Sequence, residues 1–260
     1  MAIISMIRVI GATVIKELKS TRCNMVLKVL SGVIRIVAIA WLASASSAEG
    51  AVTYLALGSA LMMIWHEVVA TGGWAFDDEI GAGTLDFTFV SKTPLSVVII
   101  GKVLANVVLE LPVGIASALA VFIVSRALPQ AELVLPLVLS FLLAIVGIVV
   151  IGFFFCMLIV LVGGRAGFFM GILPFGTTLG GFILPIYQLP QTIRIMSMCV
   201  PSSWATKALW LSIAGGGMGE IAINWGVSIA LCAVWFWIAR KLCVIGQRRL
   251  KINGDLSRQW

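Results

Sequence analysis

A long uncharged run constrains this sequence more than any other feature. No charged residue occurs between Glu132 and Arg165. About 20 apolar residues are enough for a helix to cross the hydrocarbon core of a bilayer. The apolar run from Leu133 to Val162 exceeds that length, which predicts a transmembrane helix that is tilted in the bilayer.

Similar apolar runs recur along the 260-residue chain, so that 61% of its residues are hydrophobic and only 11% are charged. Soluble domains average about 45–50% apolar and about 25% charged residues. A soluble fold cannot cover this much apolar surface with so few charges, which excludes an ordinary soluble enzyme, a disordered chain and a nucleic-acid module. We therefore expect an all-α integral membrane protein, with residues 1–260 forming one transmembrane domain.

Six segments are long and apolar enough to be membrane crossings. Their approximate bounds are Met25–Ala45, Ala51–Trp74, Leu95–Val124, Leu133–Val162, Gly167–Ile186 and Ile221–Val244. The fifth segment is interrupted by Pro174 and by Gly180-Gly181. Residues 1–22 place apolar residues on one side of a helical wheel and basic residues on the other. This pattern predicts an amphipathic helix in the head-group plane, with the start of the first crossing as the alternative.

The distribution of basic residues predicts the orientation of the chain. Lysine and arginine cluster before the first crossing, beside the loop between crossings two and three, and after the last crossing. The opposite loops hold only Arg126, Arg194 and Lys207. By the positive-inside rule, both termini lie in the cytoplasm and the protein is a multi-pass protein of the cell (inner) membrane. The formal net charge of +7 suits anionic lipid head groups, so we expect membrane lipids rather than nucleic acid as partners.

The inner loop of residues 76–93 is the most polar stretch in the middle of the chain. It is acidic on a side where the positive-inside rule expects basic residues. Thr84 can cap a short helix that begins at Leu85, and apolar side chains on this helix would dock into a groove on a cytoplasmic partner. The residues expected to dock are Glu79, Gly83, Thr84, Leu85, Phe87 and Phe89.

The same loop resembles that of the ABC-2 family of exporter permeases. The similarity lies in Glu79-x-x-x-Gly83-Thr84-Leu85, followed by Thr93-Pro94-Leu95. The amphipathic start, the six crossings and a proline-rich outer segment before the last crossing are also similar to that family. The resemblance therefore covers nearly the whole chain.

The resemblance implies a specific assembly. Such a permease is a dimer, of itself or with a sister chain, and each copy binds one ATPase subunit at the inner face, so that two ATPase copies are present. Residues 76–93 would contain the coupling helix, residues 1–22 would be the connecting helix, and residues 187–219 would form re-entrant helices at the outer end of the path. The outer gate would include Pro185, Pro190 and Pro201. ATP and Mg²⁺ would bind the partner ATPase, and this chain would bind no cofactor and catalyse no reaction.

Two observations on the residues stand beside this resemblance. The chain has no G-x-x-x-x-G-K-S/T loop, so it cannot hold a nucleotide phosphate in that way. Four polar residues fall inside predicted crossings, namely Arg35, His66, Glu67 and Glu110. A charge at the bilayer centre costs at least about 2.5–3.5 kcal/mol, so each needs a partner, water or a protein interface. A single histidine and scattered cysteines predict no metal site.

The intramembrane residues leave alternatives open. Pairing of Arg35 with Glu110 would hold two crossings together, whereas a polar site would lie in the translocation path. A gradient-driven secondary transporter could use Glu67, His66 and Glu110 for proton transfer. A third possibility is a membrane enzyme that acts on lipid through Ser202, Ser203 and Lys207 in the polar outer segment.

Overall fold

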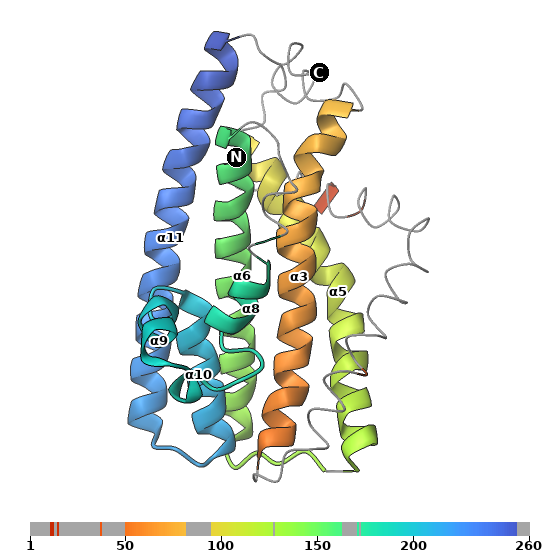
Figure 1. Ribbon diagram of the computed structural model, residues 1–260, viewed down its shortest axis with the longest axis vertical. Coiled ribbons are helices and arrows are strands. Elements are labelled where there is room, and N and C mark those ends of the chain that lie inside the picture. Colours follow the sequence, from red (N-terminus) through yellow and green to blue (C-terminus); the bar gives the residue numbers. More distant parts are fainter. Residues whose placement is uncertain are drawn as a thin grey trace.

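The computed structural model describes residues 11–12, 15, 37, 50–81, 95–126, 128–162, 171 and 173–253. Every regular element in these ranges is helical, as Figure 1 shows, which confirms the all-α prediction for this part of the chain. The four long helices are α3 (Ala51–Gly81), α5 (Leu95–Ser125), α6 (Val134–Val162) and α11 (Met218–Asn253). Apart from single residues, the predicted first crossing and the amphipathic start lie outside the described ranges.

Each long helix contains a segment that is long and apolar enough to cross a membrane. These segments are Ala51–Ala70, Ser96–Ser125, Val134–Leu158 and Met218–Gly246. They coincide with the predicted second, third, fourth and sixth crossings. Four such helices indicate a multi-pass membrane protein.

The described part of the predicted fifth crossing is not a continuous transmembrane helix. Helix α8 spans only Leu173–Leu179, about 10 Å at 1.5 Å per residue, which is too short for a hydrocarbon core of about 30 Å. The chain leaves the helix at Gly180-Gly181, as predicted, and Gly181 has a φ of 68° that glycine adopts readily. Pro174 stands in the first turn of α8 instead of interrupting a helix, because the first turn does not need its missing N–H.

The long helices form an up-and-down bundle with two ends (Figure 1). At the Gly50 end, α3, α6 and α11 begin and α5 ends; at the Gly81 end, the directions are reversed. Helices α3 and α5 are antiparallel, with Gly114 against Ala60 and the Ser117 hydroxyl donating to Ser59 Oγ at 2.9 Å. Helix α6 packs against both α3 and α11.

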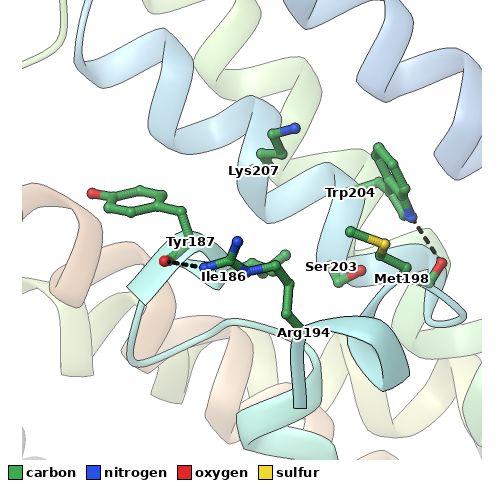
Figure 2. Close-up of a pocket in the computed structure, with 7 residues that line it drawn as sticks. All are labelled: Ile186, Tyr187, Arg194, Met198, Ser203, Trp204 and Lys207. Carbon is green, nitrogen blue, oxygen red and sulfur yellow. Dashed lines mark hydrogen bonds between the residues drawn. The ribbon is translucent and has the colours of Figure 1, made fainter. Parts of the chain in front are cut away.

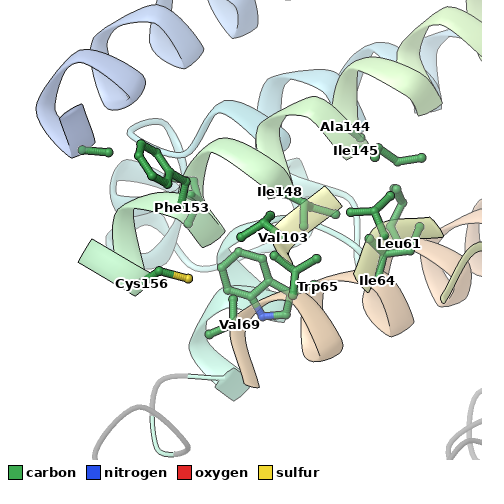
Figure 3. Packing of buried hydrophobic residues seen from close by; sticks show 14 of the residues in the cluster. Leu61, Ile64, Trp65, Val69, Val103, Ala144, Ile145, Ile148, Phe153 and Cys156 are labelled. Carbon is green, nitrogen blue, oxygen red and sulfur yellow. The ribbon is translucent and has the colours of Figure 1, made fainter. Parts of the chain in front are cut away.

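Trp65 of α3 lies at the centre of the largest buried apolar cluster (Figure 3). Its side chain is 2% exposed, and its indole N–H donates to the carbonyl oxygen of Leu173 at 3.2 Å. Its ring contacts Phe155 edge-on at 6.3 Å between ring centroids and Phe182 at 6.2 Å. Gly176 lies so close to the indole that a Cβ there would overlap it. Trp65 thus joins the segment that contains α8 to the long helices.

Three short elements follow α8 and complete what we call the insertion, residues 173–213. They are η2 (Ile186–Gln188), α9 (Gln191–Ser197) and α10 (Pro201–Ile213). Helix α10 lies along α6. At its start, the backbone of Ser202 faces Gly147, and near its end the carbonyl of Ser212 accepts a hydrogen bond from the N–H of Leu133 at 3.1 Å. Gly147 lies about 20 Å along α6 from Val134, at about 1.5 Å per residue. Helix α10 therefore begins near mid-depth and ends at the Gly50 end.

The structure corrects the start of the predicted inner loop. Residues 76–81 continue α3 as a helix, so the loop does not begin at Phe76. Glycine in a helix costs about 1 kcal/mol per residue relative to alanine. The pair Gly72-Gly73 therefore does not end α3, whose preceding part is packed in the bundle. Residues 82–94 lie outside the described ranges. The predictions for Gly83, Thr84, Leu85, Phe87 and Phe89 fall there, and the side chain of Glu79 is also not described.

Candidate functional site in the insertion

The turn between α8 and η2 is irregular backbone inside the bundle. Such backbone is tolerated at membrane depth only where protein surrounds it or where it lines a water-filled cavity. Two hydroxyl groups satisfy the carbonyls here: the Tyr54 hydroxyl donates to the carbonyl of Gly181, and Thr206 Oγ1 donates to that of Gly180 at 2.9 Å. Helices α3 and α10 therefore hold the turn from two sides.

The three prolines predicted for the outer gate each stand at the start of an element. Pro185 precedes η2, Pro190 precedes α9 and Pro201 is the first residue of α10. A residue with a fixed φ and no N–H suits a helix start, which explains these positions. The carbonyl of Pro201 also accepts a hydrogen bond from Ser228 Oγ of α11 at 2.9 Å. The prolines thus shape the insertion, and their role in a gate stays a prediction.

The serines of the lipid-enzyme hypothesis are buried at the start of α10. Ser202 and Ser203 are both almost completely covered. Ser203 Oγ lies 2.5 Å from the carbonyl oxygen of Ser197 and 2.7 Å from that of Val200. A hydroxyl held by backbone carbonyls is not presented as a nucleophile. These contacts argue against Ser203 as a nucleophile, and the enzyme interpretation stays a prediction.

The insertion forms a partly open pocket of about 220 Å³ (Figure 2). It is lined by Ile186, Tyr187, Arg194, Met198, Ser203, Trp204 and Lys207. Its two cationic side chains come from different helices, Arg194 from α9 and Lys207 from α10. The acidic residues described near the Gly50 end, Glu132 and Glu220, are not among its lining residues.

Sequence reasoning did not identify this pocket. From the sequence, Arg194 and Lys207 are two of the few outer-loop charges, and Lys207 also belongs to the enzyme hypothesis. A signal was present in the positive-inside pattern, because these are basic residues on the side where that rule expects few. Only the fold shows that the two residues line one pocket.

Three of the four predicted intramembrane polar residues are described, and they share one level of the bundle. The contact between Ala60 and Gly114 fixes the antiparallel register of α3 and α5, which places His66 and Glu67 opposite the part of α5 around Glu110. Glu110 is 7% exposed, whereas His66 and Glu67 are half-buried. Arg35 lies outside the described residues, so its pairing with Glu110 stays a prediction. Among the residues described, no three His, Cys, Asp or Glu side chains are grouped so as to hold a metal.

No model of a known protein family matches the sequence, and no curated protein matches it. The resemblance to ABC-2 permeases therefore stays a prediction from the sequence.

Proposed function

We propose that this chain is the permease subunit of an ATP-driven exporter of the ABC-2 type. Two permease copies would form the translocation path, and a separate ATPase would bind at the cytoplasmic face. The observation that carries the proposal is the insertion, in which α8 packs on α3 and α10 packs on α6 and α11, with irregular turns that reach mid-depth. Helices interrupted at this depth are typical of proteins that line a path for polar solutes.

The proposed topology has six crossings with both termini in the cytoplasm. Helix α6 ends at the Gly81 end and α11 begins at the Gly50 end, so the chain between them traverses the bundle once more. In this topology the insertion supplies the fifth crossing in pieces, with α9 and α10 as the re-entrant part. The basic residues after Gly246 in α11 favour the cytoplasm for the Gly81 end.

The length of α3 supports a cytoplasmic docking surface. Its apolar span ends at Ala70, whereas the helix continues to Gly81, about 16 Å further at 1.5 Å per residue. This extension carries Asp77, Asp78 and Glu79. A helix that projects beyond the hydrocarbon core and leads into the motif at Leu85 is accessible to a separate ATPase.

The test is affinity purification of the tagged chain from its native membranes, combined with a transport assay. We expect an ABC-type ATPase to co-purify with the wild type. Replacement of Glu79 by Arg or Leu85 by Arg should weaken ATPase association at least about 10-fold, because a reversed or inserted charge at an interface costs about 2 kcal/mol or more.

The matched control is Glu220→Arg, the same charge reversal on an exposed residue in the first turn of α11 at the opposite end. It should leave ATPase association unchanged. The proposal is wrong if the wild type purifies without an ATPase, or if transport and association survive both inner-loop substitutions.

A gradient-driven transporter is the second candidate, favoured by the shared level of His66, Glu67 and Glu110. It predicts transport that stops when a protonophore collapses the proton gradient and continues after ATP depletion. The opposite pattern would eliminate it and agrees with the ATP-driven proposal.

A further inference from the structure

The pocket of the insertion combines two cations with no described acid in its lining. Arg194 Nη2 donates to the carbonyl of Tyr187 at 2.7 Å and lies 3.5 Å from that of Leu189. Its Nε is buried and has no hydrogen-bond partner among the described residues. Lys207 is exposed, and its Nζ lies 5.4 Å from the ring centroid of Trp204. The pocket therefore offers donors and positive charge to an anion (Figure 2).

The remaining walls are largely apolar and aromatic. Ile186 and Met198 contribute aliphatic surface, and the indole of Trp204 is fixed by its N–H, which donates to the carbonyl of Met198 at 2.9 Å. The volume is several times the share of one water molecule, about 30 Å³. These walls suit an apolar chain attached to the anion.

Aromatic contacts place one side of the pocket near the membrane interface. The ring of Tyr187 lies 5.9 Å from that of Trp210, which in turn contacts Tyr54 edge-on at 5.4 Å. Tyr54 is in the first turn of α3, next to the Gly50 end. Tyrosine and tryptophan gather at the head-group level of bilayers. The pocket thus extends from that level into the bundle.

We propose that this pocket binds the phosphate group of an anionic amphiphile. Arg194 and Lys207 would hold the phosphate, since arginine suits its planar, two-pronged recognition and lysine supplies a point charge. The apolar walls would cover the first part of the attached chain. Binding requires no ATPase, so the inference goes beyond the proposed function and does not depend on it.

The usual extension of long basic side chains toward water does not explain the positions of both Arg194 and Lys207. Lysine and arginine near helix ends commonly extend their charge toward the interface, and Lys207 alone fits that behaviour. Arg194 differs, because its Nε is removed from solvent without a partner. Arg194 is half-buried at the pocket wall, where the carbonyl of Tyr187 holds its guanidinium through Nη2.

The experiment measures lipid binding to the purified full-length chain by native mass spectrometry in detergent. Phosphatidylglycerol, phosphatidylcholine and inorganic phosphate are titrated separately against the wild type and Lys207→Gln. We expect Lys207→Gln to weaken phosphatidylglycerol binding about 10-fold, because one charge-assisted contact is lost. Phosphatidylcholine, which has no net charge, should bind more weakly than phosphatidylglycerol.

Lys241→Gln is the matched control, because Lys241 also lies over an indole, with Nζ 3.6 Å from the Trp237 ring centroid, but on α11 outside the pocket. It should bind phosphatidylglycerol like the wild type. Arg194→Lys keeps the charge but loses the planar donor set, and should weaken binding by several-fold while thermal unfolding shows that the chain stays folded.

Three results would overturn the proposal. The first is wild-type affinity for phosphatidylglycerol in Lys207→Gln. The second is an equal loss in Lys241→Gln, which would indicate non-specific attraction to basic residues. The third is competition by inorganic phosphate at the concentrations at which phosphatidylglycerol binds, which would make a free anion the ligand and leave the apolar walls without a role.

Discussion

Trp65→Ala should lower the free energy of unfolding by about 3 kcal/mol, the largest loss expected for a single substitution in the described bundle. Truncation of a buried tryptophan in a soluble core costs about 3–5 kcal/mol. We expect the low end of this range, because a tryptophan that leaves the core of a membrane protein can still be surrounded by lipid. The expected loss then comes from packing contacts and the hydrogen bond, not from transfer into water. The substitution removes contacts with Phe155 and Phe182 and the indole hydrogen bond to the carbonyl of Leu173.

The measurement is reversible unfolding in mixed micelles of a mild detergent and dodecyl sulfate. Trp237→Ala is the control, because Trp237 is 58% exposed on α11 and its described partner is Lys241, a contact worth about 1 kcal/mol or less at an exposed site. A loss of less than about 1 kcal/mol for Trp65→Ala would contradict the structure at this position. If both variants lost the same free energy of unfolding, the loss would come from removing any tryptophan and not from the burial of Trp65.

Gly58→Ala should destabilise the chain by up to about 3 kcal/mol although it adds only one methyl group. Gly58 of α3 packs against the backbone of Phe182. A Cβ at position 58 would overlap the carbonyl oxygen of Phe182. A rotating side chain could relieve such an overlap, but a backbone carbonyl can move only if the insertion moves. Overpacking of this kind costs about 1–3 kcal/mol, and it should also reduce transport, because it displaces the insertion.

Gly226→Ala is the control for this second substitution. Gly226 is also helical, on α11, and a Cβ there would meet no heavy atom within 4 Å. Alanine favours a helix over glycine by about 1 kcal/mol, so this variant should be as stable as the wild type or more stable. Unfolding in the same mixed micelles checks both variants. If Gly58→Ala unfolds like Gly226→Ala, α3 and the insertion are further apart than described.

Much of the bundle was predictable because membrane crossings are determined by local composition. The apolar run ending at Val162 and the apolar run from Leu95 are each long enough to cross the hydrocarbon core, whatever their neighbours are. The break at Gly180-Gly181 was predictable for the same reason, since glycine favours a turn through its own backbone freedom. The continuation of α3 to Gly81 was not predicted, because polar residues in an aqueous helix lack the apolar signal used to find a crossing.

By itself, the sequence determined that this chain lies in a membrane, where the apolar spans of four helices lie to within a few residues, and where the predicted fifth crossing is interrupted. The tertiary structure alone decided that α10 begins at mid-depth against Gly147, that Trp65 holds α8, and that Arg194 and Lys207 line one pocket. Whether a segment crosses the membrane depends on the free energy of transferring its own contiguous residues into lipid, which is a local property of the sequence. A pocket requires residues far apart in the chain to converge, and that depends on how helices pack.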